Sequence, residues 1–160
     1  MTAAHEFRIY VAPYTNATGG KWLDPLDADY DAAVAEISQD GQLEIFAPDY
    51  EGFTGIRTES VFELEDIAKA ASDSQDAGAF IAYMAHTGCD ADDASSQFDD
   101  AYCGEWDSEE AYAENIADET LDIPERLRAY FDCEKFARDL FMSDCFSVDA
   151  LSGVYVFRHV

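Results

Sequence analysis

The feature that most constrains the fold is a long stretch without positive charge, residues 70–125. It contains 16 Asp and Glu residues and no Lys or Arg. Strongly charged segments of low hydrophobicity usually stay disordered. In the densest part of this stretch, however, apolar residues recur between the acids: Phe98, Tyr102, Trp106, Tyr112 and Ile116. The pattern therefore predicts a folded segment that has one core-facing side and one uniformly negative surface.

A helix is predicted to begin within this stretch, at Asp107. Asp is a favourable N-cap residue, and Glu110 three residues later would complete a capping box. Glu110, Glu114 and Asp118 then fall at i, i+4 and i+8, on one face. Like charges at this spacing cost a few tenths of a kcal/mol per pair. Successive acids in this row are ~6 Å apart along the helix axis. This spacing is within about a factor of two of the 3.4 Å between phosphates along a DNA strand. A helix shaped by stability alone would carry Lys at one of these positions.

The whole chain is strongly acidic, with 35 acids against 9 Lys and Arg residues and a formal net charge of −26. Such a charge keeps a protein in solution but opposes its binding to polyanions. We therefore expect no nucleic acid partner and no anionic membrane partner. A partner with a basic surface is favoured, and proteins that bind DNA have such surfaces.

The local patterns predict an α+β protein in three small parts. Residues 1–58 form an α+β unit, with strands at 7–12, 21–23 and 43–47, a helix at 27–38 and a loop at 48–55. Residues 59–97 form a helical unit that opens with an apolar stripe at Val61, Leu64, Ile67 and Ala68. Residues 98–160 form an α+β unit. Its expected elements are a strand at 101–106, the acidic helix, a helix at 124–131, a helix capped by Asp132, and strands at 145–148 and 154–157.

Positive charge returns only at the end of the chain. Residues 126–160 hold five acids and five bases, so repulsion between two copies would be weakest there. This favours a self-association surface, to which we assign Phe141, Phe146, Val154, Val156 and Phe157. An ordinary core, with Arg126, Arg128, Lys135 and Arg138 in surface ion pairs, explains the same residues equally well.

Catalytic and metal-binding motifs are absent from the sequence. His5, His86 and His159 stand outside any motif, and no phosphate-binding loop, dinucleotide fingerprint or nucleophile elbow is present. The segment 90–101 lacks the Gly and the closing Glu of a calcium loop. The four cysteines form no CxxC pair, which favours free thiols. We therefore expect no catalytic residue, metal or cofactor, and, without an apolar leader or span, a cytoplasmic location.

Five segments identify a resemblance to a known family. They are Arg8-Ile-Tyr-Val-Ala12, Gly20-Lys-Trp-Leu-Asp24, residues 98–113, residues 123–132 and Phe136-Ala-Arg-Asp-Leu140. In this order they resemble the ArdA antirestriction proteins carried by plasmids, transposons and phages. The likeness spans nearly the whole chain, and its most specific part is the Tyr-x-Gly-Glu-Trp-Asp-Ser pattern at 102–108.

The resemblance implies an elongated, three-part α+β protein that forms a homodimer through its C-terminal part. Such a dimer imitates bent duplex DNA and occupies the DNA groove of type I restriction–modification enzymes, without catalysing a reaction. We assign the partner-binding surface to nine acids: Asp99, Asp100, Glu105, Asp107, Glu109, Glu110, Glu114, Asp118 and Glu119. An alternative is a halophile-type acidic protein-binding module that is not directed at restriction enzymes. That alternative predicts evenly spread acid, whereas residues 126–160 are neutral.

Overall fold

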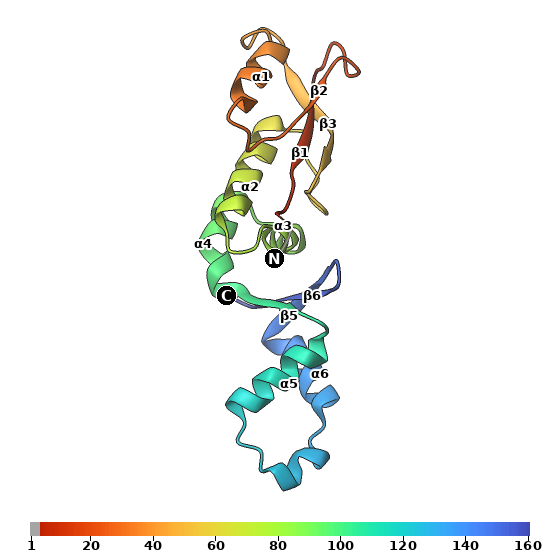
Figure 1. Cartoon of the computed structure of the whole chain (residues 1–160), viewed down its shortest axis with the longest axis vertical. Helices are drawn as coiled ribbons and strands as arrows, with labels where there is room; N and C mark the ends of the chain where they lie inside the picture. Colours follow the sequence, from red (N-terminus) through yellow and green to blue (C-terminus); the bar gives the residue numbers. More distant parts are fainter. Residues whose placement is uncertain (1–3) are drawn as a thin grey trace. The chain divides into compact units, whose positions relative to one another are not determined.

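A computed structural model describes residues 4–160 and shows an α+β protein, as the sequence predicts (Figure 1). The chain divides into two compact units, Met1–Ser96 and Gln97–Val160. Each unit contains one antiparallel three-stranded sheet and its own helices. The finer division into three parts, at residues 58 and 97, stays a prediction.

In the first sheet, the central strand has more buried residues than either of its neighbours. Its strands are β1 (Arg8–Pro13), β2 (Lys21–Leu23) and β3 (Ile45–Glu51), in the order β2-β1-β3. Ile9 and Val11 of β1 are fully buried. Helices α1 (Tyr30–Ile37) and α2 (Val61–Asp73) pack against the sheet from one side (Figure 1). Part of the core of this unit therefore lies between the sheet and these two helices, and the buried side of α3 (Ala77–Thr87) supplies another part.

Strand β3 is longer than predicted, because it continues through Pro48 into the expected loop. Proline is tolerated on an edge strand or at a bulge, where its missing N–H is not needed. Both conditions hold here, since β3 is an edge strand and its register with β1 shifts between Tyr10 and Ala12. At this irregularity the Ala47 N–H donates to the Glu59 carbonyl, 2.8 Å away, instead of to β1.

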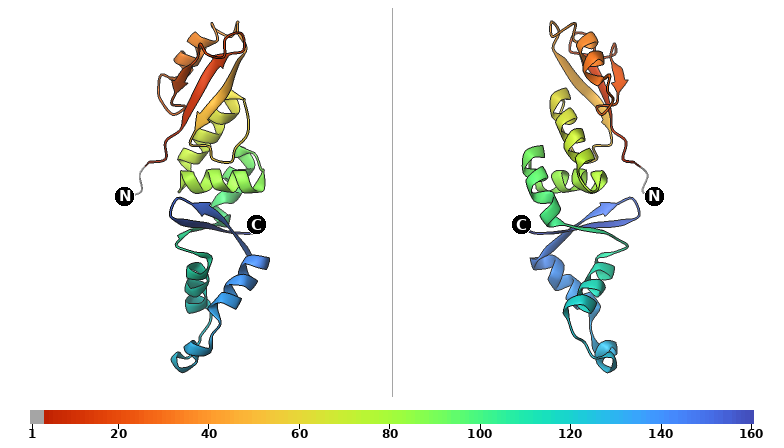
Figure 2. Two further views of the ribbon diagram at one scale, coloured as in Figure 1. Left: turned by 90° about the vertical axis from the view of Figure 1, so that its right-hand side faces the viewer. Right: turned by 60° about the vertical axis from the view of Figure 1, so that its left-hand side comes forward.

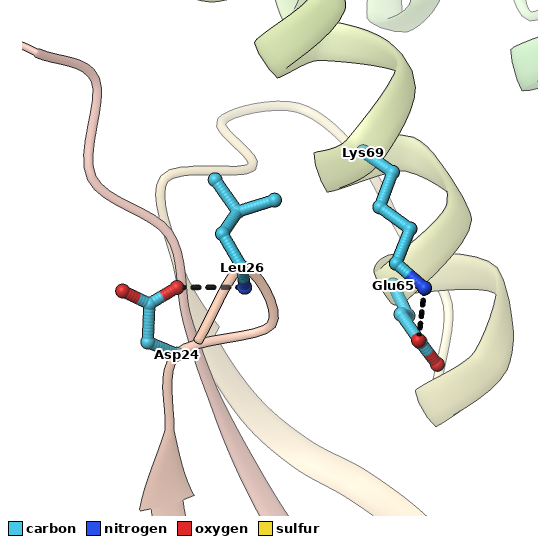
Figure 3. A network of polar contacts seen from close by, with 4 residues as sticks. All are labelled: Asp24, Leu26, Glu65 and Lys69. Atoms are coloured by element: carbon cyan, nitrogen blue, oxygen red, sulfur yellow. Dashed lines mark hydrogen bonds and ion pairs between the residues drawn. The ribbon is translucent and has the colours of Figure 1, made fainter. Parts of the chain in front are cut away.

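Helix α1 begins at Tyr30, three residues later than predicted. Two side chains before it bond to the backbone two residues further on. Asp24 Oδ1 accepts from the Leu26 N–H at 2.8 Å (Figure 3), and Asp27 Oδ1 accepts from the Asp29 N–H at 3.2 Å. Such turns compete with helix formation, so they delay the first helical turn. On neighbouring α2, Lys69 pairs with Glu65 one turn away (Figure 3).

The helical part of the first unit follows the predicted apolar stripe. Val61, Leu64, Ile67 and Ala68 are all buried on α2. This helix is followed by α3 (Ala77–Thr87) and α4 (Ala91–Ala101), the second of which ends within the second unit. Ser60 caps α2 by accepting from the Glu63 N–H, and Asp76 caps α3 by accepting from the Ala79 N–H. Among residues 4–160, no helix is both long and apolar enough to span a bilayer.

The second unit is a sheet with a helical hairpin. Strands β4 (Tyr102–Trp106), β5 (Cys145–Ala150) and β6 (Gly153–Arg158) pair in the order β4-β6-β5. Helices α5 (Glu109–Thr120) and α6 (Cys133–Ser143) run side by side, and η1 (Glu125–Tyr130) joins them (Figure 2). Phe98 and Phe157 are the largest side chains fully buried here.

One local prediction for this unit needs correction. The expected helix at 124–131 is a single 3-10 segment, and Pro124 precedes it as the N-cap instead of occupying its first position. None of the η1 side chains is buried, so packing does not stabilise a longer α-helix. Within β6, burial is complete only toward the C-terminal end of the strand. Val156 and Phe157 are fully buried, whereas Val154 and Tyr155 are half-buried.

Candidate partner-binding surface

The acidic helix is capped by Ser108, not by Asp107. The Ser108 Oγ accepts a hydrogen bond from the Ala111 N–H at 3.1 Å. Glu110 is therefore the second helical residue, and the predicted capping box is absent. Asp107, Glu109 and Glu110 still surround the positive end of the helix dipole, where carboxylates are favourable. Asp118 and Glu119 lie near the opposite end, where the dipole gives them no such stabilisation.

All nine predicted acids belong to the second unit, and most face solvent. Asp99 and Asp100 end α4, Glu105 lies on β4, Asp107 lies in the following turn, and the other five lie on α5. Eight of the nine are exposed, while Glu109 is half-buried. The structure therefore presents these acids from three consecutive elements, although their side chains differ in surroundings.

Glu109 and Asp118 have polar partners on other elements of the second unit. Glu109 Oε1 accepts a hydrogen bond from Ser147 Oγ of β5 at 2.6 Å. Asp118 Oδ1 lies 3.1 Å from Arg128 Nη1 of η1, and both side chains are about half exposed. Arg128 thus offsets part of the charge of the acidic row. For Arg128, the expected surface ion pair is confirmed.

The acidic row on α5 also acts electrostatically on Cys133, which no sequence pattern links to these acids. Burial raises the pKa of the Cys133 thiol, and the carboxylates of Glu114 and Glu110 raise it further. Asp118 and Asp132 contribute in the same direction. The thiol lies against α5, with Sγ 3.9 Å from the Glu110 carbonyl oxygen. Cys133 therefore reports on the negative potential along this row.

This contact yields a pH-dependent prediction. Glu114→Gln should lower the pKa of Cys133, because it removes the largest electrostatic contribution to a raised pKa. More thiolate is then present at pH 8, and alkylation by iodoacetamide should be faster, since the thiolate is the nucleophile. Peptide mass spectrometry resolves Cys133 from the other three free cysteines. Glu119→Gln is the matched control and should leave the rate unchanged. Equal rates in wild type and Glu114→Gln would contradict this account of the row.

The scaffold beneath the acids is centred on Tyr112 of α5. Its side chain is only 7 % exposed and clusters with Cys145 and Val156. Trp106 and Phe141 make edge contacts with the Tyr112 ring, at centroid distances of 5.3 and 6.0 Å. Burial raises the pKa of the Tyr112 hydroxyl, and a hydrogen bond with Cys103 adds to this effect. Tyr112 therefore stays neutral and anchors α5 to the sheet.

The predicted self-association residues divide into two groups. Val156 and Phe157 are 0 % exposed within a single chain, so they belong to the core and have no surface to offer a second copy. Phe141, Phe146 and Val154 are half-buried. We therefore remove Val156 and Phe157 from the proposed interface and keep the other three. Sequence periodicity could not separate these groups, because apolar residues occupy both faces of β6.

A family model described as "Antirestriction protein (ArdA)" matches residues 9–153. The chain belongs to the ArdA antirestriction family. The match covers most of the 160 residues, including all nine acids and the elements that carry them. A comparison with curated proteins found no match. ArdA membership implies an antirestriction function, and with it a restriction enzyme as partner.

Proposed function

We propose that this ArdA protein imitates duplex DNA and occupies the DNA-binding groove of type I restriction–modification enzymes. The observation that carries this proposal is the exposed acidic surface of the second unit, within a run of 56 residues that lacks Lys and Arg. Carboxylates spaced along α5 present negative charge to a partner much as phosphates do. Enzymes that bind DNA meet phosphates with many Lys and Arg side chains, and these side chains would meet the acids instead.

The amount of charge supports the same partner. A net charge of −26 equals the phosphate charge of roughly 13 base pairs, at two phosphates per pair. A homodimer would carry the charge of roughly 26 base pairs, the scale of a duplex held by a multisubunit enzyme. In this proposal the protein acts by binding alone, with no catalytic residue, metal or cofactor. Its site of action is the cytoplasm, where restriction enzymes meet DNA.

Inhibition kinetics test this proposal. We expect the protein to slow DNA methylation by a type I methyltransferase, with the inhibition relieved by more DNA but not by more methyl donor. The protein incubated alone with DNA and methyl donor should consume neither. Inhibition that persists at saturating DNA, with an unchanged apparent affinity for DNA, would contradict occupation of the DNA groove.

Single carboxylates should contribute little each, because exposed ion pairs are worth about 0–1 kcal/mol. Glu110→Gln and Glu114→Gln should each weaken enzyme binding by no more than ~1 kcal/mol, as calorimetry would measure. Glu114→Gln should also raise the free energy of unfolding slightly by removing i, i+4 repulsion, whereas Glu110→Gln also loses its favourable interaction with the helix dipole. Asp118→Asn should not share this gain, because it also loses the Arg128 ion pair. Complete loss of binding from one of these changes, in a folded protein, would indicate a discrete hot spot instead.

The proposed homodimer uses the half-buried apolar residues of the neutral C-terminal segment, Phe141, Phe146 and Val154. Val154→Glu should convert the dimer to monomers in sedimentation experiments, because a carboxylate would be desolvated between copies. Far-UV circular dichroism should stay close to that of wild type. A folded Val154→Glu protein that remains dimeric would exclude Val154 from the interface.

A further inference from the structure

The face of the first sheet that points away from its packed helices is aromatic. In most antiparallel sheets, the face that points away from the core carries polar residues instead. On β1, Ile9 and Val11 are buried in the core, so Tyr10 lies on the opposite face, and Tyr14 continues this alternation just after the strand. The register places Trp22 beside Tyr10, and Phe46 beside Ala12. We call Tyr10, Tyr14, Trp22 and Phe46 the aromatic face.

The rings of the aromatic face are ordered against one another and remain accessible. Tyr14 stacks on Phe46 with centroids 4.3 Å apart, and Tyr10 lies 5.5 Å from Trp22. The Tyr10 hydroxyl accepts a hydrogen bond from the Gly20 N–H at 3.0 Å, which fixes this ring. Trp22 is 36 % exposed and Tyr14 is 56 % exposed. Helices α1 and α2 pack on the other side of the sheet (Figure 1), while Tyr10 and Phe46 are half-buried.

A guanidinium group already occupies one edge of this face. Arg8 Cζ lies 5.4 Å from the centroid of the Trp22 ring, and Arg8 Nη1 lies 3.8 Å from Glu51 Oε2. The Arg8 and Glu51 side chains are both more than half exposed. Asp49 pairs with Tyr10 in the register and so lies on the same face. Ring and carboxylate together thus form a surface that accommodates arginine.

Charge decides between the possible occupants. A second copy would bring another −26 to this surface, and single-stranded nucleic acid, which stacks on aromatic rings, would bring phosphates. Arginine side chains of a basic protein match both the rings and the carboxylates, through cation–π and ionic contacts. We propose that the aromatic face is a second contact surface that binds arginine side chains of the protein's basic partner. This inference rests on the proposed function, because the partner is the same DNA-binding enzyme.

Labelled nona-arginine and nona-lysine peptides test the chemistry at low salt. Because the aromatic face favours guanidinium, we expect the wild-type protein to bind nona-arginine more tightly. Trp22→Ala should reduce the ratio of the two affinities about two- to fivefold, the effect of one exposed cation–π contact.

Trp22→Phe should retain part of the preference, and Tyr130→Ala, which removes an exposed ring of η1, should leave it unchanged. Arg8→Ala should raise the ratio by freeing the Trp22 ring. An unchanged ratio in folded Trp22→Ala and Trp22→Phe proteins would overturn the proposal.

Competition at the enzyme separates this inference from the proposed function. About two- to fivefold more Trp22→Ala protein should be needed to displace duplex DNA from a type I methyltransferase core. If Trp22→Ala competes as well as wild type, the aromatic face does not contact the enzyme, and DNA mimicry by the acids is unaffected. If the wild-type protein fails to compete at all, the proposed function itself is wrong. In that case the ratio of nona-arginine to nona-lysine affinity still shows whether the aromatic face binds arginine, but the type I enzyme is no longer the proposed partner.

Discussion

Neutralising all nine acids of the second unit together should abolish competition with duplex DNA. Each change of Asp to Asn or Glu to Gln removes one modest contact, and nine of them sum to several kcal/mol. Binding should also lose most of its salt dependence, because counterion release scales with the number of charge contacts. The measurement is the affinity for a type I methyltransferase across a series of salt concentrations. The fold should be retained, since eight of these side chains are exposed.

A matched control separates the position of the charge from its amount. Nine exposed acids of the first unit can be neutralised instead: Glu6, Asp29, Asp31, Glu36, Asp40, Glu44, Glu59, Asp66 and Asp73. This control carries the same net charge as the first variant, but it keeps the acids of α4, β4 and α5. We expect it to go on competing with DNA. Equal loss in both variants would mean that overall charge matters and that the second-unit surface has no special role.

Truncating Phe157 should cost about 3–5 kcal/mol of the free energy of unfolding, the usual range for a buried Phe→Ala change. Its side chain is 0 % exposed. The ring contacts Phe146, Tyr102 and Phe98 at centroid distances of 5.2, 5.5 and 6.1 Å. These contacts join β6 to β5, β4 and α4, so their loss leaves a cavity beneath the elements that carry the acids. Urea denaturation of Phe157→Ala measures the effect.

An exposed aromatic residue of the same unit is the control for this change. Tyr130 is 85 % exposed, and Tyr130→Ala should alter the free energy of unfolding by no more than about 0.5 kcal/mol. Sedimentation adds a second readout. If Phe157→Ala unfolds at nearly the wild-type urea concentration but dissociates a dimer, the ring would lie between copies and the core assignment would be wrong.

Periodicity in the sequence predicted the elements whose packing is simple. The apolar stripe of α2 has one buried side, so its pattern is unambiguous. Pro48 misled the prediction for β3, because edge position and a bulge are tertiary features. The cap of α5 was misplaced for a local reason: Asp107 and Ser108 are adjacent and both suit an N-cap. Residue type alone therefore does not select between them.

For the candidate surface, spacing alone placed Glu110, Glu114 and Asp118 on one helix. The spacing could not predict which residues of other elements would pair with these acids. Ser147 is 38 residues from Glu109, and Arg128 reaches Asp118 only because η1 folds back toward α5. Both contacts depend on tertiary structure, so no local pattern signals them. The same holds for Cys133, whose place beside the acidic row follows from the packing of α6 on α5.

Equilibrium displacement is the most direct test of DNA mimicry. A fluorescent duplex of about 30 base pairs is bound to a type I methyltransferase core, and the ArdA protein is added while anisotropy is recorded. We predict that the anisotropy falls to the value of free duplex, and that the amount of protein needed rises in proportion to the total duplex. Sedimentation should find the methyltransferase bound either to duplex or to the protein. A ternary complex of enzyme, duplex and this protein, with the duplex still bound at saturation, would contradict the account.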